Sequence, residues 1–278
     1  MWASLPFTIR RRVRQLTGYG APAAKISDKG YDVRNIREFQ AGDSLRSMHI
    51  RQYIRTGQEL VVEKLPERGA LVLFLVDVSA STRVGAAREK KAAALELIRY
   101  LAGSFIAKSH VIKIVAFASS VEAESAVMGS ANAIEAFLDD IETLKIDTKK
   151  TDPQDAIWRA SEIAGRQEYP ADVICIVSDF LFPVETWQRL EDLQGVADVF
   201  GLIMRDRIEE SMPTVSSGIR VRDAETGATF FASGSERVRP ETTLGTIDID
   251  TCVLSTAGSE QQWYDVLYEF FAMRADRR

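Results

Sequence analysis

Five oxygen-bearing side chains, spread over three places in the sequence, are suited to hold a metal ion together. They are Asp77, Ser79, Ser81, Thr151 and Asp179. Two are carboxylates and three are neutral hydroxyls, and an all-oxygen set of this kind suits Mg²⁺ or Mn²⁺ more than Zn²⁺. Few negative charges would surround such an ion, so it would stay electrophilic and accept one more carboxylate. The residue types therefore predict a site that docks an acidic side chain from a partner.

The elements that must position these residues are strands and helices in alternation. Residues 70–76 and 172–177 are continuous apolar runs, typical of strands covered on both faces, and each run leads into one of the carboxylates. Further strands are expected at 111–117 and 197–204, and helices at 85–107, 131–144, 153–165 and 184–193. In the helix at 85–107, Lys90 is expected on the solvent side. The alternation predicts an α/β fold with a doubly wound, mostly parallel sheet, in which ligands bind at the carboxyl ends of strands.

The two ends of the sequence have a different character from this alternation. Residues 1–66 hold 12 Lys and Arg against 6 Asp and Glu, a net of +6, while the rest holds 23 against 34, a net of −11. Two short strand-like stretches around 224–227 predict a β-hairpin, and the last residues show one apolar helical face. The expected divisions are a basic N-terminal segment at 1–66, the α/β core with the metal site at 67–205, a β-rich extension at 206–258 and a C-terminal helix at 259–278.

The basic first quarter leaves two interpretations open. A surface for nucleic acid or anionic lipid is one, but Arg10–Arg12 is a short run without interleaved aromatic residues, so we expect no nucleic-acid binding. The other is that its arginines pair with the acidic remainder of the chain or receive an acidic partner. Arg37, Arg46 and Arg55 are the candidates for partner binding, and internal ion pairing is the alternative for them.

Composition also bears on where the protein works. No apolar run is long enough to cross a bilayer, and the first residues lack the basic head of a signal peptide. Cys175 and Cys252 each lie in an apolar, strand-like run without paired spacing, so we expect buried free thiols in a reducing compartment. The expected location is the cytoplasm.

Two alternatives compete with the metal site. Asp77 and Ser79 could cap the helix that follows them, and Thr151 or Asp152 could cap the next one. In a different class, a Mg²⁺-dependent haloacid dehalogenase-like phosphotransferase also places a nucleophilic Asp at the end of a first strand. That chemistry requires an acid two residues later, where this chain has Ser79. The chain also lacks a Gly-x-x-x-x-Gly-Lys phosphate loop, so it is not itself a P-loop ATPase. Its two histidines, His49 and His110, give no support to a Ser-His-Asp triad, and we expect no enzyme.

The candidate ligands resemble the metal-ion-dependent adhesion site of von Willebrand factor A domains. In that family an Asp-x-Ser-x-Ser motif, a distant Thr and a late Asp hold the ion. The resemblance assigns Asp77, Ser79 and Ser81 to the motif, Thr151 to the distant position and Asp179 to the late one. This chain departs from the family at Lys149–Lys150, where glycines usually precede the Thr.

Flanking motifs are similar to those of the bacterial domain of unknown function 58 family. Residues 37–49 and 53–57 resemble its Arg-Glu-Tyr-x-x-Gly-Asp-x-x-Arg signature and the Arg-x-Gly that follows, although the Trp of the signature is absent. Residues 223–227 resemble its Asp-x-Glu-Thr-Gly hairpin, and the resemblance covers about residues 31–278. It implies a von Willebrand factor A-like fold and a non-enzymatic adaptor that works with MoxR-type AAA ATPases in complex assembly or chaperoning.

Overall fold

The structure is a computed structural model, and it describes most of the chain in two units. The described residues are 2–9, 33–38, 50–64, 69–83, 85, 88–146, 151–166, 170–181, 184–206, 209, 219–222, 229–232 and 240–276. The larger unit, called the α/β unit below, comprises Met1–Arg14 and Ala70–Arg278. The smaller unit comprises Gln15–Gly69.

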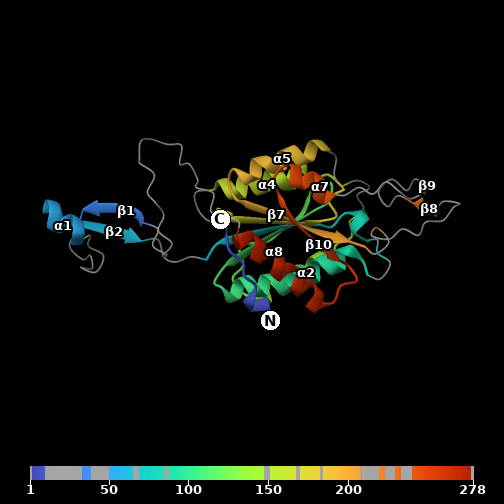
Figure 1. Cartoon of the computed structure of the whole chain (residues 1–278), viewed down its shortest axis with the longest axis horizontal. Coiled ribbons are helices and arrows are strands. Elements are labelled where there is room, and N and C mark those ends of the chain that lie inside the picture. Colours follow the sequence, from blue (N-terminus) through green and yellow to red (C-terminus); the bar gives the residue numbers. More distant parts are fainter. Residues whose placement is uncertain are drawn as a thin grey trace. The chain divides into compact units, whose positions relative to one another are not determined.

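A six-stranded sheet with the order β10-β7-β6-β3-β4-β5 forms the centre of the α/β unit (Figure 1). Its strands are β3 (Leu71–Asp77), β4 (Val111–Phe117), β5 (Val121–Glu124), β6 (Val173–Ser178), β7 (Asp198–Arg205) and β10 (Asp250–Ser255). All neighbouring pairs are parallel except β4 and the edge strand β5. The predicted α/β fold with a mostly parallel sheet is confirmed.

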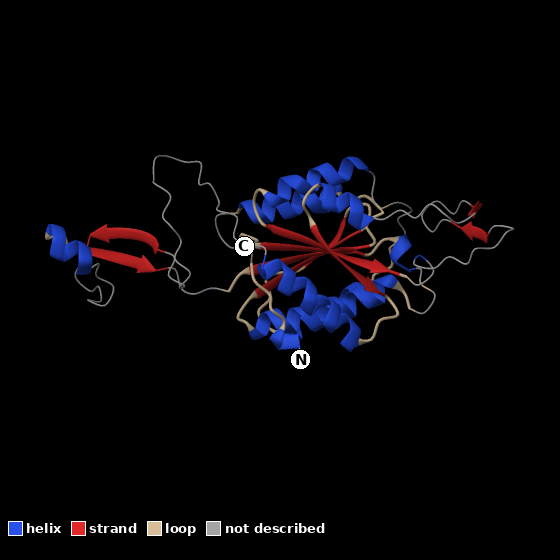
Figure 2. Cartoon of the chain, viewed as in Figure 1, coloured by secondary structure: helices blue, strands red, loops and turns tan. Residues whose placement is uncertain are grey.

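Helices cover both faces of this sheet (Figure 2). They are η1 (Trp2–Ser4), η3 (Ala80–Arg83), α2 (Lys90–Ala107), α3 (Ala131–Thr143), α4 (Gln154–Gly165), α5 (Val184–Gln194), α7 (Pro240–Thr246) and α8 (Glu260–Asp276). Phe74 of β3 packs into the core on the side of α2, α3 and α8, whereas Leu73 and Leu75 pack into a second core with α4, α5 and α7. Because successive strand residues face opposite sides, a strand between two helical layers must be apolar throughout.

The boundaries that we expected for the core need correction at both ends. The core does not end at residue 205, because β10 pairs in parallel with β7 and α8 packs against the sheet. At the other end, Trp2, Leu5 and Phe7 are buried in the same core as α2. Segments distant in sequence complete the hydrophobic core, so residues 2–9 and 240–276 belong to the α/β unit.

Two smaller pieces lie outside the sheet. The smaller unit pairs β1 (Val33–Glu38) antiparallel with β2 (Leu60–Lys64) and contains α1 (Ile50–Thr56). The predicted hairpin is confirmed: β8 (Ile219–Arg222) pairs antiparallel with β9 (Thr229–Ala232).

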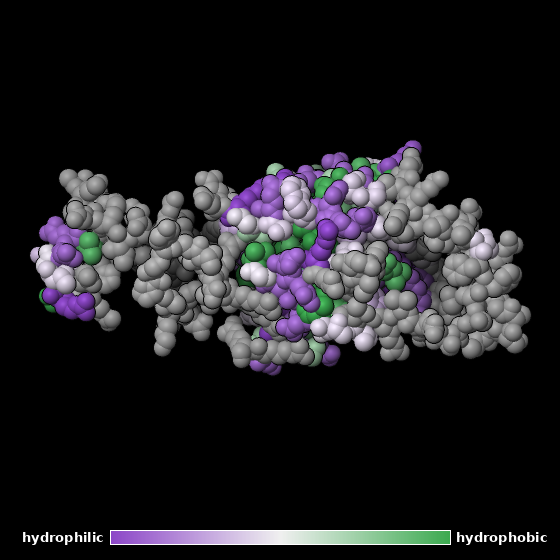
Figure 3. Space-filling view, turned by 90° about the horizontal axis from the view of Figure 1, so that it is seen from above, coloured by the Kyte–Doolittle hydropathy of each residue, from purple (hydrophilic) through white to green (hydrophobic). Residues whose placement is uncertain are grey.

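On the surface, hydrophobic patches are separated by hydrophilic side chains (Figure 3). Among the described helices, none is long and apolar enough to span a membrane.

Candidate metal site

The two predicted carboxylates follow neighbouring strands. Strands β3 and β6 pair with Val76 opposite Val177, so Asp77 and Ser178 end them at the same edge of the sheet. From β3 the chain proceeds to β4 on one side and later returns to β6 on the other. Ligands of open α/β sheets bind at such a switch in strand order. The fold therefore places Asp77 and Asp179 where this class of sheet binds ligands.

Asp77 is the centre of a buried network of hydroxyl groups. The backbone N–H of Ser79 donates to its Oδ1 at 2.9 Å, and the Ser178 hydroxyl donates to its Oδ2 at 2.7 Å. The hydroxyl oxygens of Ser79 and Ser81 lie 3.0 Å apart. The structure thus brings Asp77, Ser79 and Ser81 together. It also adds Ser178, which follows the second apolar run but was not among the predicted ligands.

A turn with an unusual backbone holds Asp179. The residue after it, Phe180, is fully buried and has a φ of 56°, a conformation that is costly for a bulky side chain. Its N–H donates to the Ser178 hydroxyl at 3.0 Å, and its ring occupies the space that a side chain at Gly201 of β7 would fill. Because Gly201 has no side chain, the Phe180 ring can pack against β7, and this packing holds the turn that carries Asp179.

The electrostatics of the two carboxylates suit a cation. Burial, and then the negative charge of Asp179, raise the pKa of Asp77 to about 7, although hydrogen bonds from Ser79 and Ser178 lower it. A divalent ion between the carboxylates would offset both the cost of burying the Asp77 charge and its repulsion by Asp179. Within the part of the chain that is described, no three His, Cys, Asp or Glu residues gather to hold a metal. A cation here would have to take hydroxyl ligands from Ser79 and Ser81, as the hard ions do.

Lys90, the first residue of α2, contacts the site, and our prediction that it faces solvent was wrong. Its side chain is only 4% exposed, and its ammonium lies 3.2 Å from Oδ2 of Asp179 and also pairs with Glu209. Burial alone would lower the pKa of Lys90, but the charges of Asp179 and Glu209 raise it above its ordinary value. The sequence contained one indication of this contact. A lysine in the first turn of a helix lies at the positive end of the helix dipole, where a cation is unfavourable unless acidic groups offset it.

Thr151, the predicted ligand from the loop, is buried at the same edge of the sheet. The N–H of Asp152 donates to the carbonyl of Ala118 at 2.8 Å, directly after the β4 residue that pairs with Asp77. The Asp152 carboxylate accepts from the N–H of Gln154, so Asp152 serves the start of α4. Lys149 and Lys150, which precede Thr151, lie outside the described residues.

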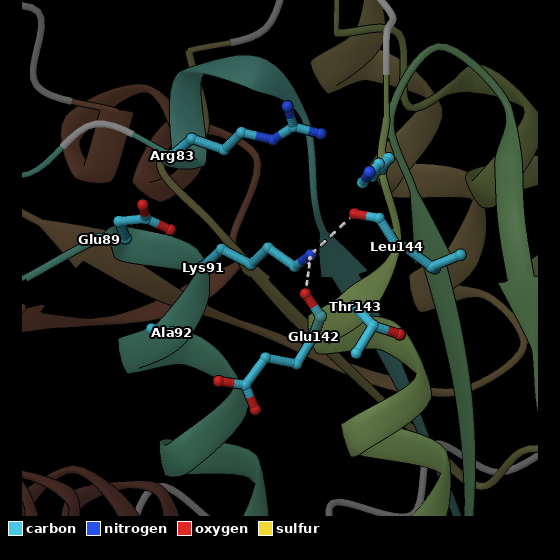
Figure 4. A pocket seen from close by; sticks show the side chains of 8 residues that line it. Arg83, Glu89, Lys91, Ala92, Glu142, Thr143 and Leu144 are labelled. Atoms are coloured by element: carbon cyan, nitrogen blue, oxygen red, sulfur yellow. Dashed lines mark hydrogen bonds between the residues drawn. The ribbon is translucent and has the colours of Figure 1, made fainter.

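Two cations, Arg83 and Lys91, line a pocket beside the end of α3 (Figure 4). The ammonium of Lys91 donates to the carbonyls of Glu142 and Leu144 at 3.1 and 3.4 Å, and the Arg83 guanidinium donates to the carbonyl of Ile146 at 2.6 Å. These bonds satisfy carbonyls at the end of α3, where a cation also complements the helix dipole. A pocket of about 220 Å³ lies among these residues. The arrangement ties η3 and α2 to the segment that leads to Thr151.

The helix-capping alternative for Asp77 and Ser79 does not hold for the long helix that follows. Helix α2 begins at Lys90, and Glu89 occupies its N-cap position. Directly after Ser79 the chain forms the short η3 turn, in which the Thr82 hydroxyl donates to the Ser79 carbonyl. The side chain of Asp77 accepts the Ser79 N–H, which shapes the loop and leaves the serine hydroxyls at the strand end.

The three candidate arginines of the smaller unit have separate outcomes. Arg55 is exposed near the end of α1, and Arg37 lies on β1, where side chains are not described. Arg46 lies outside the described residues. Their role in partner binding stays a prediction. The two cysteines, Cys175 and Cys252, are buried and free, as predicted.

Comparison with solved structures defines the class of fold. BatB from Bacteroides thetaiotaomicron is 14% identical with a TM-score of 0.51, and the match covers 75% of this chain and 100% of that one. An aerotolerance-related membrane protein from Bacteroides fragilis, with multiple mutations to serines, is 12% identical with a TM-score of 0.52, over 74% and 100% of the chains. A von Willebrand factor type A protein from Catenulispora acidiphila is 10% identical with a TM-score of 0.45, over 77% and 43%. The two matches with TM-scores above 0.5 show the fold, which is von Willebrand factor A-like, and identities this low show nothing beyond the fold.

The family follows from the sequence comparison. A family model described as "Protein of unknown function DUF58" matches residues 35–246, so the chain belongs to this family. The predicted resemblance is confirmed. A search of curated proteins found no match.

Proposed function

We propose that this protein is a non-enzymatic adaptor that binds a partner protein through a divalent cation. Mg²⁺ or Mn²⁺ would be held by Asp77, Ser79, Ser81, Thr151 and Asp179. The observation that carries the proposal is the meeting of two buried carboxylates with hydroxyl groups at the ends of β3 and β6. The partner class, a MoxR-type AAA ATPase, comes from the family resemblance. Action in the cytoplasm likewise stays a prediction.

The ligand set favours an incoming acidic side chain. Two carboxylates neutralise a divalent ion only formally, and neutral hydroxyls leave it able to attract another carboxylate. Leu181, two residues after Asp179, is 52% exposed and offers an apolar contact next to the ion. Interfaces commonly combine such an apolar anchor with a charged contact. The edge of the sheet therefore suits a partner that presents Asp or Glu beside an apolar residue.

The same site argues against phosphoryl transfer. A haloacid dehalogenase-like mechanism requires an acid two residues after the nucleophile, and Ser79 cannot protonate a leaving group as a carboxylic acid does. We expect no Mg²⁺-dependent hydrolysis of p-nitrophenyl phosphate above background. Turnover that disappears in Asp77→Ala would overturn the adaptor assignment in favour of an enzyme.

The adaptor function can be tested by capture of a purified partner. The immobilised full chain and its Asp77→Ala variant would be offered a MoxR-type ATPase of the same organism, in Mg²⁺ and in chelator. Asp192→Ala is a matched control, because this carboxylate is exposed on α5. We expect retention only by the wild type and the control, and only with Mg²⁺. Equal retention by Asp77→Ala, or retention unchanged by chelator, would contradict a metal-dependent contact.

A further inference from the structure

Lys90 places a positive charge inside a site that is suited to a divalent cation. Its ammonium lies 3.2 Å from Oδ2 of Asp179, and both side chains are buried. The other oxygen of Asp179, Oδ1, accepts the N–H of Leu181 at 3.3 Å. Lys90 also pairs with Glu209, whose side chain is 39% exposed. The ammonium thus bridges one carboxylate of the metal site and one carboxylate that faces solvent.

We propose that Lys90 is an internal counter-ion that competes with the divalent cation for Asp179. The inference rests on the metal site of the proposed function and concerns its regulation. Two cations that share one carboxylate repel each other, and burial strengthens this repulsion because little water screens it. Metal binding therefore requires Lys90 to move its contact from Asp179 toward Glu209. The protein alone binds the cation weakly.

The charges around the site explain why a partner relieves this competition. Two carboxylates, those of Asp179 and Glu209, pair with the Lys90 ammonium, and Asp77 adds a third negative charge near Asp179, so a divalent ion brings the cluster to neutrality. A carboxylate from the partner, bound to the ion, places negative charge beside the ion and Lys90 and so reduces the repulsion between these two cations. The cation and the acidic partner consequently bind with positive cooperativity, each raising the affinity for the other by the same factor.

A purely structural ion pair would not need this position. Lys90 is the first residue of α2, where the helix dipole disfavours a cation. Its neighbour Lys91 serves the end of α3 instead, through two backbone carbonyls, and does not contact Asp179 among the ion pairs of the described residues. Among the described residues, the ion pairs of Lys90 are the ones that link the metal site to Glu209, so Lys90 is the residue through which the charge of the site is adjusted.

Calorimetric titration with MnCl₂ tests the inference on the full chain and four variants. Lys90→Met should bind Mn²⁺ at least about tenfold more tightly than the wild type, the scale on which contacts around metal ligands act. Lys90→Arg, which keeps the charge, should stay weak. Glu209→Gln should bind more weakly than the wild type, because Lys90 then has Asp179 as its remaining partner. The double variant Lys90→Met/Glu209→Gln should bind about as tightly as Lys90→Met, because Glu209 acts on the site through Lys90.

The outcomes separate this inference from the proposed function. If the wild type binds Mn²⁺ and Lys90→Met binds no more tightly, Lys90 is not a competitor, while the metal site stands. If neither protein binds Mn²⁺ at millimolar concentration, the metal site itself is absent and both ideas fail. Circular dichroism in chelator checks that each variant is folded. If Lys90→Met does not fold, Glu209→Gln tests the inference instead. It should bind Mn²⁺ more weakly than the wild type, and an affinity equal to that of the wild type would overturn the competition.

Discussion

Two buried charge clusters lie at opposite edges of the same sheet, and they differ in how their charges are balanced. At the amino edge, Asp198 begins β7 and Asp250 begins β10, and Arg274 of α8 contacts both carboxylates at 2.6 and 2.5 Å. The guanidinium also lies over the ring of Phe200, 4.9 Å from its centre. Both carboxylates are paired with the same guanidinium, so we call this cluster closed.

At the carboxyl edge the cation serves only part of the cluster. Lys90 contacts Asp179 and Glu209, whereas the described part of the chain places no lysine or arginine in an ion pair with Asp77. Asp77 is instead held by hydroxyl and N–H donors, and its pKa rises to about 7 because it is buried near Asp179. Buried carboxylates on adjacent strands can therefore be structural or ligand-binding, and the placement of the cation distinguishes the two.

The largest expected effect breaks the closed cluster. Arg274→Met leaves two buried carboxylates without their cation, which should lower the free energy of unfolding by about 3–5 kcal/mol. Urea denaturation followed by circular dichroism measures this loss. Arg274→Lys should fall in between, because it keeps the charge and loses the planar fork that reaches both strands. A loss below about 1 kcal/mol for Arg274→Met would show that this cluster does not stabilise the fold.

The next prediction uses one substitution at each edge. Asp77→Asn removes the repulsion with Asp179, so in chelator the variant should be at least as stable as the wild type. It should lose the stabilisation by Mg²⁺, which reaches about 2.7 kcal/mol when the ion is present at a hundred times its dissociation constant. Asp198→Asn at the amino edge should be destabilised equally with and without Mg²⁺. Thermal unfolding in Mg²⁺ and in chelator compares the two variants. If Mg²⁺ stabilised Asp77→Asn as much as the wild type, the carboxyl edge would not be a metal-binding edge.

The sequence predicted this comparison only in part. Continuous apolar runs identified β3 and β6, and the polar residues after them identified Asp77 and Asp179, because both signals are local. Strand β10 was recognisable as an apolar run around Cys252, but its pairing with β7 is a contact between distant segments. The closed cluster of Arg274 depends on that pairing, so no local pattern could predict it.

Lys90 shows the same limit within the candidate site. Helical periodicity placed it on the solvent side of α2, because the apolar positions of the helix face the sheet. Its burial comes from Asp179 and Glu209, which lie 89 and 119 residues further along the chain. Ser178 could have been found from the sequence, since it follows a buried strand directly before a predicted ligand.

A smaller effect is expected from the turn that carries Asp179. In Gly201→Ala the new Cβ would lie 2.8 Å from the ring of Phe180, so the ring or the strand must shift. Overpacking of this kind costs about 1–3 kcal/mol of stability. Because Phe180 also holds the backbone beside Asp179, the affinity for Mn²⁺ should fall as well. Gly103→Ala in α2, where a Cβ meets no atom within 4 Å, is the control: it should raise stability by up to about 1 kcal/mol and leave the affinity for Mn²⁺ unchanged.

The smallest effect concerns Thr151 and decides whether the open site has a fifth ligand from the protein. Thr151→Val keeps the shape of the side chain and removes the hydroxyl, so calorimetry should show weaker Mn²⁺ binding. Lys91→Met removes two hydrogen bonds to the segment that leads to Thr151 and should weaken binding less, because it acts only through the position of that segment.

The double variant Thr151→Val/Lys91→Met separates these roles. If Lys91 acts through Thr151, the second substitution should cost no further affinity once the hydroxyl is gone, which is non-additivity in a double-mutant cycle. Additive losses would mean that Lys91 supports the site by another route, through η3 or α2. If Thr151→Val bound Mn²⁺ with full affinity, the ion would have four protein ligands. The metal site at the carboxyl edge would then have still more room for an incoming carboxylate, unlike the closed cluster of Arg274.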